Sequence, residues 1–106
     1  MKIKIIQTTT DNKKTANFLA EYLVKEKLSP CIHILPNIQS IYNWKGKLVT
    51  SYDLLVVIKT IPKKVQKCKD IILKYHNYDI PELIISDGEI LNEDYKIWFV
   101  DTINKL

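Results

Sequence analysis

The stretch CIHILPNIQSIYNWKGKLVTSYDLLVVIKT, residues 31–60, decides which fold this chain can adopt. Both halves are rich in β-branched and aromatic residues, and they meet at WKGK, residues 44–47. Gly46 can adopt the positive φ that a tight hairpin turn requires, so we predict a long antiparallel β-hairpin. Pro36 cannot donate a ladder hydrogen bond, so it marks a bend, a bulge or a sheet edge.

The second half of this hairpin contains LLVVI, residues 54–58, which is apolar at consecutive positions. Such a run is typical of a central strand that is covered on both faces. The arms of the hairpin are longer than a domain of this size can cover by itself. We therefore expect the distal part, with Ile41, Tyr42, Trp44 and Leu48, to pack on a second subunit.

The residues before the hairpin predict a strand and a helix. Residues 2–9 alternate between apolar and polar and indicate a strand with one buried face. Thr10 or Asp11 is expected to cap a helix that ends near Leu28, before the helix-stopping Ser29-Pro30. Its apolar stripe has helical spacing and consists of Ala16, Leu19, Ala20, Leu23 and Val24.

The residues after the hairpin predict a second helix, a short strand and a last helix. Thr60 and Pro62 are expected to begin the second helix, and LIIS, residues 83–86, the strand. Asp87-Gly88 is typical of a turn. Asn92 would then cap the last helix, whose predicted buried face consists of Tyr95, Trp98, Phe99, Thr102, Ile103 and Leu106.

The order of these elements is strand, helix, strand, strand, helix, strand and an added helix. This order predicts an α+β ferredoxin-like sandwich, βαββαβ plus a C-terminal helix, in a single domain over residues 1–106. One face of the sheet would carry the first two helices. The other face would need cover, which neighbouring subunits could supply.

Composition excludes several classes of function. The chain has 106 residues and a net charge of +4, with only two glycines, which argues against a glycine-rich phosphate loop. Its lysines are scattered, as is typical of a solvated surface, so we expect no nucleic-acid partner. No apolar run approaches the roughly 20 residues of a membrane span, so we expect no membrane partner.

The two cysteines indicate a compartment. Cys31 and Cys68 form no CxxC motif, and two cysteines make no disulfide framework. Because free thiols suit a reducing environment, we expect a cytoplasmic location.

HNYDIPE, residues 76–82, joins the second predicted helix to the next strand and carries several reactive groups. His76 could bind copper or zinc, act as a general base, or cap carbonyls at the helix end. Asp79 and Glu82 could support acid–base chemistry or bind a hard cation, or they are solvated loop charges. Pro81 keeps the preceding residue extended, so these two carboxylates need not point the same way.

A second group of candidate ligands lies at the start of the hairpin. Cys31 and His33 alternate along a predicted strand, so their side chains share a face and could chelate one ion. The stronger alternative is that Cys31 is a small core residue, and Cys68, on the apolar face of the second helix, is expected in the core. No nucleophile arrangement or cofactor motif is recognisable, so we expect no enzymatic activity.

Three motifs, SIYNWKGKL, LLVVIKT and HNYDIPELI, resemble the CutA1 family, also called divalent-cation tolerance proteins, in their order and spacing. The resemblance covers essentially the whole chain. It implies a ferredoxin-like fold similar to PII signalling proteins, assembled as a homotrimer in which the long hairpins reach across to neighbouring sheets. It further implies binding of copper or another divalent cation, with Cys31, His76 and Glu82 as the metal ligands.

The chain departs from the family pattern at several positions. His33 replaces an amide, Lys45 replaces an acid at the turn, and Gln7 and Tyr75 stand where some members carry a cysteine and a second histidine. The function that the resemblance implies is a homotrimeric divalent-cation tolerance protein. The alternatives are a PII-like regulatory trimer, which binds a small molecule or partner protein at clefts between subunits, and a mainly structural trimer.

Overall fold

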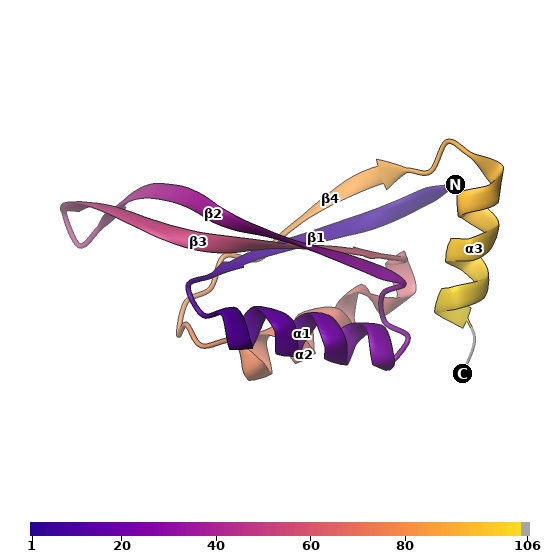
Figure 1. Cartoon of the computed structure of the whole chain (residues 1–106), viewed down its shortest axis with the longest axis horizontal. Helices are drawn as coiled ribbons and strands as arrows, with labels where there is room; N and C mark the ends of the chain where they lie inside the picture. The colour runs from indigo at the N-terminus through magenta and orange to yellow at the C-terminus, as the bar shows by residue number, and fades with distance from the viewer. Residues whose placement is uncertain (105–106) are drawn as a thin grey trace.

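The computed structural model describes residues 1–104 and has the predicted α+β architecture. Its elements are β1 (Lys2–Thr10), α1 (Lys13–Lys25), β2 (Cys31–Trp44), β3 (Lys47–Thr60), a 3₁₀ turn (Pro62–Lys64), α2 (Val65–Tyr75), β4 (Ile84–Glu89) and α3 (Glu93–Asn104). The four strands form one antiparallel sheet in the order β2-β3-β1-β4, and α1 and α2 lie side by side on one face of it (Figure 1). Within residues 1–104, no helix is long and apolar enough to cross a membrane.

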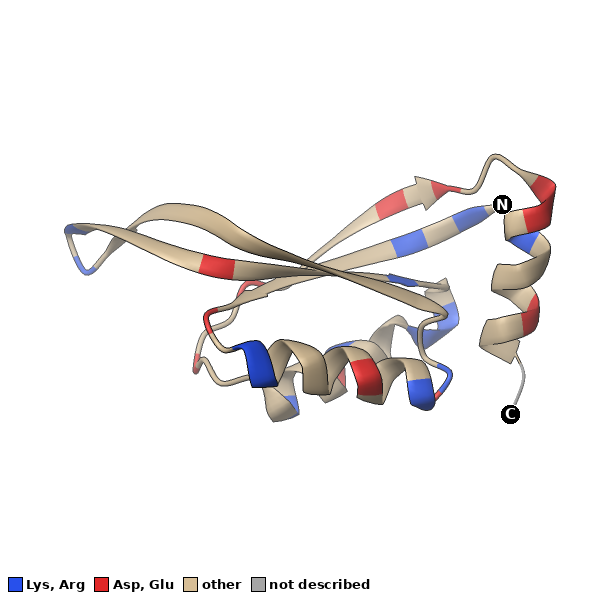
Figure 2. Ribbon diagram, in the orientation of Figure 1, with Lys and Arg blue, Asp and Glu red and all other residues tan. Residues whose placement is uncertain are grey.

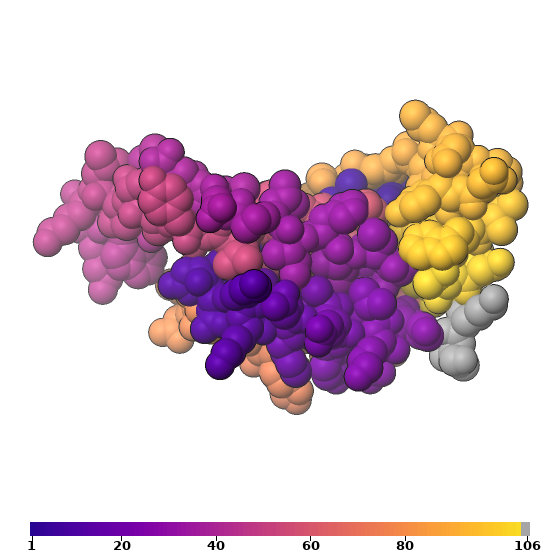
Figure 3. Space-filling model, in the orientation of Figure 1, coloured from indigo at the N-terminus to yellow at the C-terminus, as the bar shows by residue number. Residues whose placement is uncertain are grey.

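The predicted hairpin is confirmed, with its turn at Lys45-Gly46 between Trp44 and Lys47. Both turn residues have positive φ, 52° for Lys45 and 81° for Gly46, as a two-residue hairpin turn requires. The register slips between residues 35 and 38, so Pro36 lies in a β-bulge, and Asn37 also has positive φ. The distal hairpin stands out from the body of a molecule that measures 47 × 26 × 21 Å (Figure 3).

The main core lies between the sheet and the first two helices. Its fully buried members include Leu19 and Leu23 of α1, Val56 and Ile58 of β3, and Ile72 of α2. This packing confirms the central part of the predicted α1 stripe. Val24, predicted on the same stripe, is 37% exposed because it lies at the edge of the buried face.

The N-terminus of α1 is capped by Asn12, not by Thr10 or Asp11 as predicted. The Asn12 side-chain oxygen accepts a hydrogen bond of 3.1 Å from the backbone N–H of Thr15. The prediction was wrong because Thr10 continues β1, where it is fully buried, and its hydroxyl donates to the side chain of Asn77.

A second apolar cluster lies under α3. Phe99 and Ile103 of this helix are buried against Ile3 and Ile90. Trp98, predicted to be buried, is 43% exposed, because neighbouring helical residues point about 100° apart and Phe99 takes the inward position. Leu106 of the predicted face lies outside the described residues.

Asp87-Gly88 lies within β4 and forms no turn, so that prediction was wrong. The pair is typical of a turn locally, but the neighbouring strand β1 stabilises it in the sheet. Lys4 of β1 forms a 2.5 Å ion pair with Asp87, which lowers the pKa of this exposed carboxyl. A Cβ on Gly88 would lie 2.9 Å from Cδ1 of Ile5, so glycine permits the close approach of that side chain.

The second helix also begins later than predicted. Thr60 is the last residue of β3, where it is fully buried and its hydroxyl donates to the carbonyl of Leu28 at 2.7 Å. Pro62 opens a 3₁₀ turn, and regular helix starts only at Val65.

Candidate functional site

His76 ends α2, and both of its ring nitrogens have protein partners. Its backbone turns to an extended conformation, which carries the chain away from the helix. Nδ1 accepts from the backbone N–H of Tyr78 at 2.9 Å, so Nε2 carries the proton and donates to the carbonyl of Thr9 at 2.9 Å. Burial lowers the pKa of His76, against the opposing effects of the Thr9 carbonyl and the Asp11 carboxylate. The neutral imidazole therefore fixes residues 76–78 to the end of β1.

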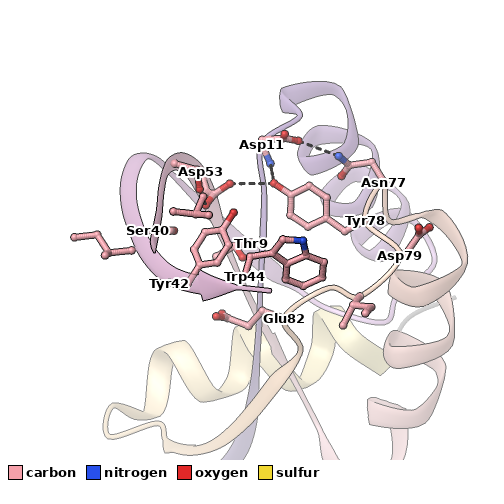
Figure 4. Close-up of a pocket in the computed structure, with 14 residues that line it drawn as sticks. Thr9, Asp11, Ser40, Tyr42, Trp44, Asp53, Asn77, Tyr78, Asp79 and Glu82 are labelled. Carbon is pink, nitrogen blue, oxygen red and sulfur yellow. Dashed lines mark hydrogen bonds between the residues drawn. The ribbon is translucent and has the colours of Figure 1, made fainter. Parts of the chain in front are cut away.

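Tyr78 extends this network to the base of the hairpin. Its hydroxyl accepts from the backbone N–H of Asp11 at 2.9 Å and donates to the carboxylate of Asp53 at 3.1 Å (Figure 4). Ser51 donates to the other oxygen of Asp53, also at 3.1 Å. Burial, followed by the hydrogen bond to Asp53 and its charge, raises the pKa of Tyr78 strongly, so the phenol remains a neutral donor.

A hollow of about 920 Å³ opens between the distal hairpin and residues 77–82. Its walls carry four carboxylic acids and no lysine. They also include the rings of the hairpin residues Tyr42 and Trp44. Figure 4 shows these rings and the acids around one space, and Figure 2 shows acidic segments where the hairpin leaves the body, with basic segments at its turn. We call this space the acidic hollow and define it by Asp11, Asp53, Asp79, Glu82, Tyr42 and Trp44.

The candidate ligand Glu82 lies in this hollow. It is exposed, and its only side-chain hydrogen bond within residues 1–104 is a 3.3 Å contact that it accepts from Gln7. A carboxylate held this weakly remains available to a cation.

Cys31 does not line the acidic hollow, but it lies on the same face of the sheet as Asp53, the face that α1 and α2 leave open. Its sulfur is 3.8 Å from Nε2 of His33, as expected for alternate residues of one strand. Lys59, the cross-strand partner of Cys31, places Nζ 3.9 Å from the sulfur and 3.5 Å from Nδ1 of His33. The thiol and the imidazole therefore form an accessible pair of donors beside a cation.

Cys68 occupies the core, as predicted. It is fully buried, its thiol lies 3.6 Å from the carbonyl of Leu28, and burial raises the pKa of this thiol.

The three predicted metal ligands therefore lie in different surroundings within one chain. Across residues 1–104, no three His, Cys, Asp or Glu side chains converge on a point that could hold an ion. Sequence reasoning missed the part that Asp53 plays. The signal in the sequence is that Asp53 is a single acid directly before the apolar run LLVVI, residues 54–58, where a charged side chain needs a partner.

The open-faced sheet, the two helices on its other face and the long hairpin define a ferredoxin-like α+β protein with an acidic hollow at the hairpin base. Residues 4–102 match the family described as "CutA1 divalent ion tolerance protein". The chain therefore belongs to the CutA1 family.

Relatives and solved structures agree with this membership. The chain is 32% identical over 98 residues to the "Divalent-cation tolerance protein CutA" of Thermus thermophilus, covering 90% of this chain and 92% of that protein. It is 34% identical to human "Protein CutA", covering 85% of this chain and 50% of the human protein. The CutA1 structure from Ehrlichia chaffeensis superposes with a TM-score of 0.89 at 28% identity, covering 97% of this chain and 96% of that one. The Thermus and Ehrlichia proteins are named as divalent-cation and divalent-ion tolerance proteins, and the human protein is named only as CutA.

Proposed function

We propose that this chain acts as a homotrimeric divalent-cation tolerance protein, built from one domain over residues 1–106, that binds copper or another divalent cation. The observation that carries the metal proposal is the Cys31–His33 pair, whose sulfur and nitrogen are 3.8 Å apart. Zn–S and Zn–N bonds of about 2.3 and 2.0 Å hold two tetrahedral ligands roughly 3.5 Å apart, so a small movement suffices. Thiolate with imidazole suits copper and zinc better than hard cations.

His76 and Glu82 are the other ligands in this proposal. They differ in the hydrogen bonds that each would have to release before it could bind an ion. His76 would have to give up a hydrogen bond to Thr9 or to Tyr78 before it could offer a lone pair. Glu82 would have to release only Gln7. A neighbouring subunit would supply the donors that complete the coordination of the ion.

Two further observations support the finer parts of the proposal. Leu48 and Tyr52 alternate with the residues that face the acidic hollow, and they are 81% and 67% exposed, as expected for a surface that a neighbouring subunit covers. Cys31 and Cys68 are free thiols, which supports a reducing compartment such as the cytoplasm.

A metal titration tests the ligand set. Reduced, chelator-stripped protein is titrated with Cu(I), Cu(II) and Zn(II) by calorimetry, and one saturable site per subunit is expected. Cys31→Ser or His33→Gln should weaken binding about tenfold or more, since each removes one of two preformed donors, whereas Cys68→Ala should leave it unchanged. Binding that survives both substitutions but is lost in His76→Gln would overturn the Cys31–His33 assignment.

A second candidate function is a regulator that binds a small molecule, and the acidic hollow favours it. The hollow lies at the hairpin base beside residues 77–82, and it could form part of a cleft between subunits of the kind that a PII-like regulator would use. Its volume of about 920 Å³ lies within the range of small-molecule sites.

A further inference from the structure

The layer formed by α1 and α2 carries a cluster of aromatic rings outside both apolar cores. Phe18 and Tyr22 lie one turn apart on α1, and the ring centre of Tyr75, at the end of α2, lies 5.0 and 5.6 Å from theirs. Phe18 is 44% exposed and Tyr75 36%, and none of the three belongs to a core cluster. Exposed apolar side chains that gather in this way mark an interaction surface.

The ring cluster continues into a hollow between the two helices. Tyr22 also lines this hollow, which has a volume of about 410 Å³ and includes the apolar side chains of Leu28 and Ile71. Its charged lining residues are Glu26, Lys67 and Asp70. We call the rings and the hollow together the interhelical groove, and define it by Phe18, Tyr22, Leu28, Ile71 and Tyr75.

The proposed assembly leaves this groove uncovered. In that assembly, neighbouring subunits cover the distal hairpin and the face of the sheet that the helices leave open. The interhelical groove belongs to the helix layer on the other face, and none of its residues lies in β2 or β3 (Figure 1). The exposure of its rings is therefore expected to persist in the assembled protein.

The helix layer carries the positive charge of the molecule. Residues 13–27 and 62–75 contain nine lysines and three acids, a net charge of +6, although the whole chain has only +4. Lysines that are scattered along the sequence are thus gathered by the fold on two neighbouring helices (Figure 2). This surface is complementary to a negatively charged partner.

Four of these lysines flank the groove at helical spacing. On α1, Lys14 and Lys25 lie one turn before and one turn after the two rings. On α2, Lys67 and Lys74 lie one turn on either side of Ile71. The same rims carry two acids, Glu21 and Asp70. Within residues 1–104 no carboxylate lies within 4.0 Å of the four ammonium groups, so they can pair with acids of a partner.

We propose that the interhelical groove binds an acidic amphipathic helix of a partner protein. The apolar stripe of that helix packs on the three rings, as a third helix packs into the groove between two others. Its carboxylates lie against the lysines of the rims, so an aromatic centre is surrounded by charged pairs, as in protein interfaces. The proposal depends neither on the metal pair nor on the acidic hollow, because it shares no residue with them.

A synthetic peptide tests this proposal, with binding to the full-length assembled protein followed by fluorescence anisotropy. The probe has about 16 residues, long enough to form a helix, with leucines along one face and glutamate and alanine elsewhere. Two control peptides replace every leucine by alanine or every glutamate by lysine. We expect saturable binding of one probe per subunit, and binding of either control at least about tenfold weaker. Absence of saturable probe binding, or equal binding of the control without leucine, would overturn the proposal.

Two matched pairs of variants locate the site. Phe18→Ala should weaken probe binding about tenfold or more, as expected for a central aromatic anchor, whereas Leu73→Ala should leave it unchanged. Lys74→Gln should weaken binding about two- to fivefold, as expected for an exposed ion pair, whereas Lys69→Gln should leave it unchanged. Both control residues are exposed and lie two positions from Ile71, about 200° around α2 from the groove. Equal losses within either pair would refute the site.

Other occupants of the groove would give different results. A wild-type protein heavier than three chains, reduced to three by Phe18→Ala, would show that a second copy fills the groove, and the proposal would be wrong. It would also be wrong if the probe does not bind and vesicles of phosphatidylcholine and phosphatidylglycerol bind in a manner that Phe18→Ala abolishes. Cys31→Ser should leave probe binding unchanged, because Cys31 lies on the opposite face of the sheet.

Discussion

At the scale of single residues, His76 and Asp53 are groups that could bind a ligand, but in one chain both make hydrogen bonds that hold the fold together. The two nitrogens of His76 join the end of α2 to β1 and to residue 78. The carboxylate of Asp53 receives the Tyr78 hydroxyl, so the loop also contacts the base of the hairpin. Within one chain, HNYDIPE thus connects three elements, and the exposed Glu82 carboxylate accepts only a 3.3 Å contact from Gln7 among the side chains of residues 1–104.

The lowered pKa of His76 makes stability depend on pH. A histidine whose pKa is lower in the folded state takes up a proton more readily when unfolded, so folding stability falls as pH drops below about 6.5. The denaturant midpoint of the wild type should therefore decrease between pH 7.5 and pH 5.5.

His76→Gln should flatten that dependence. At pH 7.5 it should also cost about 0.5–1.5 kcal/mol for the lost hydrogen bond. Gln39→Ala, at an exposed residue of β2 that has no titratable group, is the control and should leave the slope as in the wild type. An unchanged slope in His76→Gln would contradict the assignment of this pH dependence to His76.

At the scale of elements, the two faces of the distal β2–β3 hairpin differ: one lines the acidic hollow and the other is exposed in a single chain. Tyr42, Trp44 and Asp53 line the acidic hollow, whereas Leu48 and Tyr52 alternate with them and are exposed. The bulge after Leu35 sets this arrangement, because an extra residue in one strand shifts the register and bends the distal arm.

The turn that closes the hairpin depends on Gly46. A Cβ there would meet nothing within 4 Å, so the cost of Gly46→Ala arises only from the positive φ, about 1–2 kcal/mol. Amide exchange of residues 40–51 should accelerate about 5- to 30-fold, while that of residues 2–7 stays constant. Lys45→Asn, which suits positive φ better, should slow exchange or leave it unchanged. Equal acceleration in both regions would show global destabilisation instead.

At the scale of the whole molecule, the structure leaves large apolar side chains uncovered at a distance from its cores. The distal hairpin projects along the longest dimension, 47 Å, and α1 and α2 cover only one face of the sheet (Figure 1). This arrangement supports the proposed assembly, in which neighbouring subunits cover the hairpin.

Leu48→Lys tests the assembly. The side chain is 81% exposed within one chain, so a lysine should not disturb the fold but should disrupt packing against a neighbour. In sedimentation equilibrium we expect the mass to fall from three chains to one, with an unchanged circular dichroism spectrum. Leu73→Lys, at a 47% exposed position on α2, should remain trimeric. A wild-type protein that sediments as a single chain would contradict the proposal.

The sequence alone determined the element order, the turn at Lys45-Gly46 and the central part of the buried faces of α1 and α3, whereas Val24 and Trp98 of the predicted faces are exposed. These features depend on interactions between near neighbours: apolar periodicity of two or 3.6 residues, and the positive φ that glycine permits. Local patterns were wrong where a distant strand overrode them, as at Asp87-Gly88, which β1 keeps in the sheet, and at Thr10, which is buried in a strand and does not cap a helix.

Only the tertiary structure decided which functional residues meet. It brought Asp53 and Tyr78, separated by 25 residues, into one hydrogen bond, and it placed His76 beside Thr9, 67 residues away. It also separated Cys31 from His76 and Glu82 and left it beside His33. The physical reason is that the sheet order and the bulge fix these distances through packing of the whole chain, which no local stretch of sequence specifies.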